Sequence, residues 1–292
     1  MKNITKLIAL IILAAILHGC DYVVPTVAVS TPPVDTTAPI TSIIIDSTTT
    51  RTVLIEDYTG HKCGNCPHAA DRLDTIIQTY GASIIPIAVH AGFFAWPDAT
   101  GNYTTDFQTT VGTAWDTYFG MSAAGNPQGC VNRLGYPGNF PASYNSWAGT
   151  AAYFLGLPHK MNIKITNVYR GSKRSLTTTI SSKYLTALDS TYKLSVVVTE
   201  DSVIDHQDFY YPTTHDDPTY VFKHILRASL NSTWGDTLSS GSQPMNSVFT
   251  KTYSLDLSST KIKVDKNCHV VAFIYNAATY EVVQAEMATV TK

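Results

Sequence analysis

The feature that most constrains the fold of this chain is a pair of cysteines, Cys63 and Cys66, placed between a short apolar run and a helical pattern. The run TVLIEDY, residues 52–58, is rich in β-branched residues and predicts a buried strand. Pro67 suits the first turn of a helix, and Gly81 suits its end. The pattern therefore predicts a strand, a turn that carries the first cysteine, and a helix that begins near the second.

The following segments alternate between strand and helix patterns up to about residue 157. Residues 83–90 predict a second strand, although Pro86 argues against a fully hydrogen-bonded central position because proline has no backbone N–H. The further elements expected here are a helix near residues 107–119, a short strand around residues 130–131 and a helix over residues 144–155. This order predicts an α/β arrangement, with a sheet covered by helices.

From residue 158 onward the pattern changes to strands alone. Short strands separated by turn residues predict a β-sandwich. The expected strands are residues 162–169, 176–182, 193–199, 222–230, 248–255, 270–275 and 281–290. Between the third and the fourth of these, histidines and aspartates are dense, which raises the question of a metal site. Aspartate and proline together favour a solvated loop instead; the residues concerned are Asp205, His206, Asp208, His215, Asp216, Asp217 and His224.

The N-terminus has the pattern of an export signal. Lys2 and Lys6 precede an apolar stretch, residues 8–17, that is too short to span a bilayer. The stretch ends in LHGC, which resembles the bacterial lipobox, whose cysteine receives a diacylglycerol group before cleavage. We expect a signal peptide over residues 1–19 and a lipid anchor on Cys20; the alternative is a soluble secretory signal that happens to contain this cysteine.

Residues 20–50 are rich in threonine and proline. Dense prolines favour extended polyproline conformations and block helix formation. We therefore expect a tether that joins the lipid anchor to the folded part of the chain.

Charge and compartment limit the expected partners. The formal net charge of -2 creates no field that would gather nucleic acid, so no nucleic-acid partner is expected. Export leads to an oxidising compartment, in which cysteines can pair. We expect Cys130 and Cys268 to be buried free thiols; a disulfide between them is the alternative.

The dithiol at a helix start predicts thiol–disulfide exchange. The free N–H groups and partial positive charge of a helix N-terminus stabilise a thiolate, which is the form that attacks disulfides. Cys63 is the expected attacking thiol, and Cys66 is expected to resolve the mixed disulfide. The charges of His61 and Lys62 are expected to favour the thiolate as well.

Two other interpretations of the dithiol stay open. It can be an inert short disulfide, or it can bind a metal together with His61, His68 or His90. Two cysteines alone make a poor structural zinc site, which needs four ligands. We predict no metal and no cofactor.

The stretch TVLIEDYTGHKCGNC resembles the thioredoxin superfamily, which often has a buried acid six residues before the first cysteine, here Asp57. The resemblance implies that Asp57 takes the proton of the second cysteine; an exposed acid at the strand end is the alternative. Thioredoxins also have a cis-proline that faces the dithiol and orients the substrate, and Asn126-Pro127 is the candidate, since only X-Pro bonds are readily cis. A trans loop proline is the alternative. The sequence departs from Trp-Cys-Gly-Pro-Cys at the tryptophan and at the internal proline.

Three motifs together give a closer resemblance: IEDYTGHKCGNCPHAA, NPQGCVNRLGYP and FKHILRASLNSTWGD. They resemble the Bacteroidetes outer-membrane lipoprotein family named for a 28 kDa outer membrane protein (Omp). The resemblance covers about residues 50–292 and implies a thioredoxin-like domain over residues 51–157 and an immunoglobulin-like sandwich over residues 158–292. It implies no particular reaction.

Together these observations predict an envelope-anchored thiol–disulfide oxidoreductase. Its expected partners are the membrane, through the lipid on Cys20, and protein thiols or disulfides, which include a redox partner. The alternative is a surface-exposed binding or structural lipoprotein in which the C-x-x-C motif is an inert disulfide.

Overall fold

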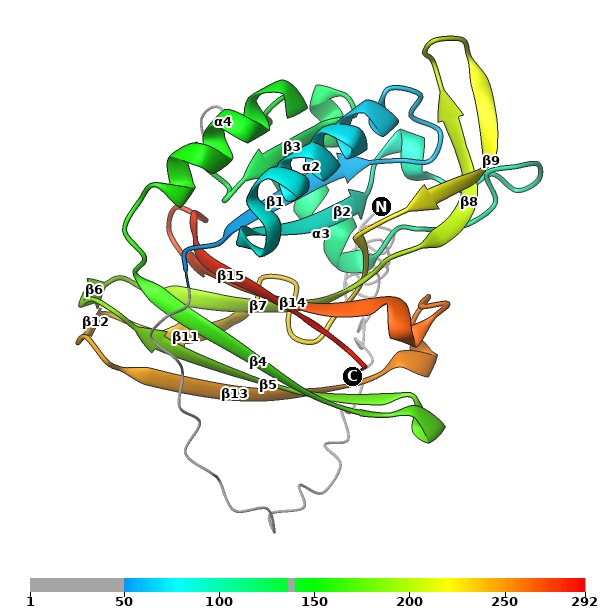
Figure 1. Ribbon diagram of the computed structural model, residues 1–292. Coiled ribbons are helices and arrows are strands. Elements are labelled where there is room, and N and C mark those ends of the chain that lie inside the picture. The colour runs from blue at the N-terminus through cyan, green and yellow to red at the C-terminus, as the bar shows by residue number, and fades with distance from the viewer. Residues whose placement is uncertain (1–49, 136–139, 292) are drawn as a thin grey trace, which may run out of the picture. The chain divides into compact units, whose positions relative to one another are not determined.

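The computed structural model describes residues 50–135 and 140–291, a strand-rich part of the chain with a few helices (Figure 1). The predicted signal peptide, the lipidation site Cys20 and the tether up to residue 49 lie outside the described residues. No helix within the described ranges has the length and apolar character needed to cross a membrane.

The strand–helix part has the order that the sequence predicted. Its elements are β1 (Val53–Thr59), α2 (Cys66–Tyr80), β2 (Ile84–His90), α3 (Thr110–Phe119), β3 (Gln128–Val131) and α4 (Tyr144–Leu155). β1 pairs in parallel with β2 and antiparallel with β3. All seven residues of β1 are buried, which explains its continuous apolar run.

Successive side chains of β1 point to opposite faces of the sheet and enter different cores. Val53 and Ile55 pack with α2 and α4, whereas Leu54 and Tyr58 pack with α3. The helices therefore cover both faces of this part of the sheet, as the α/β interpretation predicted.

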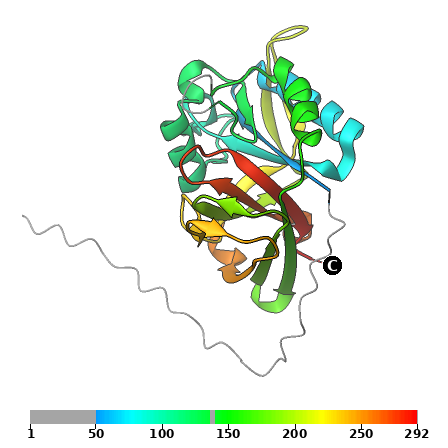
Figure 2. The same ribbon diagram turned by 90° about the vertical axis from the view of Figure 1, so that its left-hand side faces the viewer.

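The strand-rich part begins after α4. Its strands are β4 (Met161–Arg170), β5 (Ser175–Tyr184), β6 (Leu188–Asp189), β7 (Tyr192–Glu200), β8 (Val203–Phe209), β9 (His215–Phe222), β10 (Ile225–Ser229), β11 (Asp236–Ser239), β12 (Ser242–Gln243), β13 (Val248–Asp256), β14 (Cys268–Asn276) and β15 (Val282–Thr289). A three-stranded sheet, β13-β5-β4, packs on β7 and β14 through an apolar core. Figure 2 shows these strands as layers below the helices.

One sheet runs through both parts of the chain. Its strand order is β15-β14-β7-β10-β2-β1-β3, and β11 also pairs with β7. β10 pairs in parallel with β2 at Ile225 and Ala88. Since β10 pairs with β2 only at this point, no residue of β10 lies opposite Pro86 and the missing N–H of the proline costs no hydrogen bond there. This agrees with the expectation from the sequence. All described residues fall in one compact unit.

β8 and β9 form a two-stranded hairpin that protrudes from the body of the molecule (Figure 1). The prediction of a solvated loop for this region was wrong. The segment is polar because much of the hairpin surface is exposed, yet its backbone is paired from Val203–Phe222 to Phe209–His215. This hairpin determines the surroundings of the dithiol.

Candidate functional site

Cys63 and Cys66 form a disulfide, with their Cα atoms 5.3 Å apart. α2 begins at Cys66 and has Pro67 in its first turn, as the sequence predicted. Cys63 lies in the preceding turn, where its N–H donates to the carbonyl of Gly60 and its carbonyl accepts from the N–H of Cys66. The helix start is thus next to both sulfur atoms, which is the arrangement that stabilises a thiolate after reduction.

The hairpin covers this turn. The N–H of Asp208 donates to the carbonyl of His61 at 2.8 Å, and the N–H of Tyr210 donates to the carbonyl of Gly64 at 3.0 Å. The side-chain amide of Gln207 donates to the carbonyl of Cys63 at 3.0 Å. As a result both cysteines are only 2% exposed.

Gly64 is required by this contact. The ring of Tyr210 lies so close to its α-carbon that a β-carbon would not fit. The Cys63-Gly64-Asn65-Cys66 turn is therefore shaped to receive the segment that follows β8.

Asp57 is buried in β1, 3% exposed, and its Oδ1 atom has no hydrogen-bond partner among the described residues. Burial raises the pKa of Asp57 to about 8. A carboxyl group with this pKa holds its proton at neutral pH and can exchange it with a thiol of ordinary pKa. The structure thus favours the buried acid over the exposed strand-end acid.

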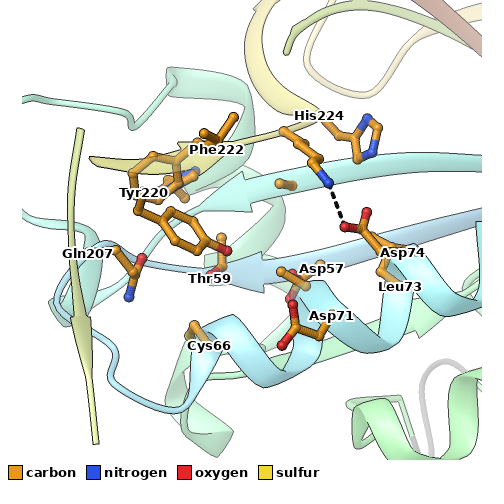
Figure 3. A pocket seen from close by; sticks show the side chains of 15 residues that line it. Asp57, Thr59, Cys66, Asp71, Leu73, Asp74, Gln207, Tyr220, Phe222 and His224 are labelled. Carbon is orange, nitrogen blue, oxygen red and sulfur yellow. Dashed lines mark hydrogen bonds and ion pairs between the residues drawn. The ribbon is translucent and has the colours of Figure 1, made fainter. Parts of the chain in front are cut away.

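Asp57 and Cys66 line the same cavity, whose volume is about 220 Å³. Figure 3 shows it between α2, the ends of β1 and β2, and the hairpin, from which Gln207 and Tyr220 reach in. Exposed Asp71 stands at its edge. The cavity therefore links the buried thiol and acid to the surface.

His90 is a second unpaired polar group in this cavity. It is 2% exposed, and neither of its ring nitrogens has a hydrogen-bond partner within the part of the chain that the structure describes. Burial lowers the pKa of His90 well below its usual range, so the ring is neutral. A neutral imidazole and a protonated carboxyl group thus face one cavity beside Cys66.

The Asn126–Pro127 peptide bond is cis, as the sequence analysis expected of a thioredoxin-type proline. Pro127 directly precedes β3, in which Gln128 pairs with Tyr58 of β1. It therefore lies at the end of the sheet where the dithiol turn begins.

The predicted roles of His61 and Lys62 change in the structure. Burial lowers the pKa of His61, and its ring stacks on Tyr103 with centroids 5.5 Å apart. The expectation that His61 supplies positive charge was therefore wrong, because a buried imidazole is neutral at pH 7. Lys62 is engaged elsewhere, because its Nζ lies 2.7 Å from the Asp98 carboxylate.

Aspartates of the hairpin attach it to the rest of the chain, and His206 holds one of them within the hairpin. His206 Nδ1 lies 2.7 Å from Asp216, which also accepts from Tyr103, and Thr105 donates to Asp205 at 2.6 Å. Within the described ranges no group of three His, Cys, Asp or Glu residues is arranged to hold a metal ion.

Cys130 and Cys268 are free and buried, as predicted. Burial raises the pKa of both thiols. The alternative disulfide between them is absent from the structure, which describes both residues.

Sequence reasoning missed the residues that cover the dithiol, above all Gln207, Asp208 and Tyr210. They follow it by more than 140 positions, so no local motif joins them to it. Residues 203–209 read VIDHQDF and do not alternate between apolar and polar side chains, so the sequence carried no clear strand signal here.

Comparison with known proteins gives one family and several structural neighbours. The family model described as outer membrane protein Omp28 matches residues 113–292, more than half of the chain but not the dithiol. No curated protein is a significant match.

Among solved structures, HBP35 of Porphyromonas gingivalis is similar with a TM-score of 0.62 and 16% identity, over 85% of this chain and 77% of that chain. A domain of the outer membrane lipoprotein Omp28 from Porphyromonas gingivalis matches with a TM-score of 0.30 and 19% identity, over 46% of this chain and 90% of that chain. At these identities the likeness to HBP35 concerns the fold alone.

Proposed function

The chain belongs to the family of outer membrane protein Omp28, and from this premise we propose that it is a thiol–disulfide oxidoreductase of the outer membrane that acts on protein disulfides. The observation that carries the proposal is the cavity shared by Cys66 and Asp57. An unpaired buried acid with a raised pKa beside a dithiol at a helix start is suited to proton transfer during disulfide exchange.

Exchange begins from the disulfide form seen in the structure. A substrate thiolate attacks the sulfur of Cys63, the Cys63–Cys66 bond breaks, and Cys66 leaves as a thiolate that takes the proton of Asp57. A second substrate thiolate attacks the substrate sulfur of the mixed disulfide, which completes the substrate disulfide and releases Cys63. The substrate loses two electrons and the protein dithiol gains them.

The reverse reaction reduces a substrate disulfide. The Cys63 thiolate attacks one substrate sulfur and releases the other as a thiolate. Asp57 then takes the proton of Cys66, whose thiolate attacks Cys63 and frees the substrate. Pro127, at the end of the sheet where the dithiol turn begins, is proposed to orient the substrate.

We also propose the finer architecture and the anchor. The parallel β1–α2–β2 unit with its dithiol, followed by Pro127 and antiparallel β3, supports a thioredoxin-like part. The packing of β13-β5-β4 on β7 and β14 supports an immunoglobulin-like sandwich. A lipid on Cys20 would hold both at the membrane.

The reduction potential of the dithiol tests the proposal. The purified, unlipidated chain is equilibrated in glutathione buffers, and a value between about -120 and -270 mV is expected of a working dithiol. Cys63→Ser is expected to abolish exchange, whereas Cys66→Ser is expected to accumulate mixed disulfides. Equal residual activity of the two variants would contradict the assigned roles.

One observation favours a second candidate, a binding or structural lipoprotein with an inert bridge. Both cysteines are 2% exposed beneath the hairpin, which suits a disulfide that is never attacked. This candidate predicts a potential below about -300 mV, typical of structural disulfides.

A further inference from the structure

We propose that the β8–β9 hairpin occupies the substrate site, and that the substrate is an extended segment of a non-native polypeptide that replaces the hairpin on the Cys63–Cys66 turn. This inference rests on the proposed exchange activity. It adds the class of substrate and the way in which that substrate is held.

The hairpin binds the turn through its backbone. Asp208 and Tyr210 are two positions apart, so their N–H groups leave the same edge of the strand. The acceptors, the carbonyls of His61 and Gly64, flank Cys63. Any extended polypeptide presents N–H groups at the same spacing, and strand addition of this kind is a common mode of peptide recognition.

The surroundings of the turn suit apolar side chains. Tyr210 of the hairpin packs its ring against Gly64, which shows the kind of side chain that a replacing segment can place there. Phe93 and Trp96 belong to the segment after β2, whose backbone packs against Gly60. They are 63% and 54% exposed, and their rings lie 5.6 Å apart. Lys62 links this pair to the turn, because its ammonium group lies over the Phe93 ring and its N–H donates to the carbonyl of Phe94.

These exposed rings indicate the state of the partner. A native protein buries most of its apolar side chains and pairs its strand edges, whereas a non-native chain exposes both. The partner that fits a backbone acceptor pair beside exposed aromatic rings is therefore a non-native polypeptide with apolar residues near its cysteine.

The hairpin is held at its base, where Val203 and Phe222 are buried in an apolar cluster, and by the hydrogen bond from Tyr103 to Asp216. Among the described residues β8 and β9 form a strand ladder only with each other, so the end that covers the dithiol can lift away while the base stays packed. Once it has left, a substrate sulfur can approach Cys63, and the exchange steps written above proceed without further reagents.

The test compares the access of two reagents to Cys63. The full chain is used with Cys20→Ser and Cys66→Ser, which leaves Cys63 as the thiol that attacks the disulfide of each reagent and releases thionitrobenzoate, since Cys130 and Cys268 are buried. The reagents are Ellman's reagent and a short apolar peptide whose cysteine is activated as a disulfide with thionitrobenzoate. A third reagent is the same peptide with N-methyl groups at the backbone positions flanking its cysteine.

Asp208→Pro weakens the contact, because proline has no N–H to donate and is tolerated at a strand edge. We expect it to raise the reaction rate of Cys63 with Ellman's reagent and the peptide by about tenfold, the usual effect of one hydrogen bond. The N-methylated peptide is expected to react about tenfold more slowly than its parent, since it lacks the donors.

Tyr210→Ala provides an independent variant in case the proline impairs folding, and Tyr153→Ala, at an exposed tyrosine of α4, is its matched control. Only Tyr210→Ala is expected to raise the rates. The inference is overturned if Cys63 reacts as fast as a free cysteine with the hairpin intact, or if N-methylation has no effect. A Cys63 that stays unreactive in every variant would instead refute the proposed function.

Discussion

Glu56 and Asp57 are neighbours on β1, and both carboxyl groups are buried, yet their surroundings are opposite. Because side chains alternate along a strand, Glu56 points toward α3 and Asp57 toward α2 and the cavity. Each carboxyl group also has a cysteine in its environment: Cys130 donates to Glu56, and Cys66 shares the cavity with Asp57.

Glu56 is fully paired. Arg133 donates to it through Nε at 2.8 Å and Nη2 at 2.7 Å, and the thiol of Cys130 lies 3.2 Å from the same carboxylate. The guanidinium group in turn lies among four aromatic rings, those of Trp115, Phe119, Phe273 and Tyr275. Phe273 and Tyr275 belong to β14, so this cluster joins the two parts of the chain.

Asp57 differs, because within residues 50–135 and 140–291 no cation pairs with it and its Oδ1 atom has no hydrogen-bond partner. Burial alone therefore does not identify a reactive acid. The proposed role of Asp57 rests on its missing partner as well, because an unpaired acid can exchange its proton with a neighbouring thiol.

The largest expected loss in the free energy of unfolding comes from breaking the pair between Glu56 and Arg133. Arg133→Met keeps most of the side-chain volume but leaves the Glu56 carboxylate buried without its cation. Removal of one partner of a buried ion pair costs about 3–5 kcal/mol of the free energy of unfolding. Urea denaturation at pH 7 measures this loss.

Lys261→Met is the control, because it breaks the exposed pair with Asp106 and should cost less than about 1 kcal/mol. The double variant Glu56→Gln, Arg133→Met is expected to recover part of the loss, since no charge remains buried. An Arg133→Met variant as stable as Lys261→Met would show that the cluster is not a structural element.

Asp57→Asn tests the unpaired carboxyl group, and we expect it to raise the free energy of unfolding where Arg133→Met lowers it. The folded protein holds the Asp57 proton up to pH about 8, whereas the unfolded chain releases it near pH 3.8. Between these values the folded state binds more protons, so the wild-type free energy of unfolding falls as pH rises. The asparagine cannot titrate, and we expect it to stabilise the disulfide form by about 2 kcal/mol or more at pH 8.

Urea denaturation from pH 4 to pH 8 measures how steeply the free energy of unfolding falls as pH rises. Asp71→Asn, at an exposed carboxyl group of the same cavity, is expected to leave it unchanged. If the wild-type protein and Asp57→Asn follow the same pH profile, Asp57 is ionised in the fold and the proposed proton transfer loses its basis.

The contrast also explains what the sequence allowed us to predict. β1, α2 and the position of Asp57 follow from local signals: a β-branched run, Pro67 at the helix start and Gly81 at its end. Such signals reflect the backbone preferences of a few neighbouring residues, so they can be recognised without knowledge of the rest of the fold.

The partners of these residues come from distant positions and were not predicted. Arg133 lies 77 residues after Glu56, and Gln207 lies 144 residues after Cys63. These contacts depend on how β3 pairs with β1 and on how the hairpin folds back over the dithiol turn, both of which are set by tertiary packing. The polar hairpin lacked the apolar content by which the other strands were recognised.

The smallest effect is expected at Cys130. Its thiol is a weak donor, and Arg133 keeps both oxygens of Glu56 paired without it. Cys130→Ala should therefore cost only about 1 kcal/mol of the free energy of unfolding in urea, close to the value of one hydrogen bond. It should also leave the reduction potential of the Cys63–Cys66 pair unchanged, because Cys130 contacts Glu56 on the face of β1 opposite to the cavity. A loss as large as that of Arg133→Met, or a shifted potential, would mean that the two faces of β1 act as one site.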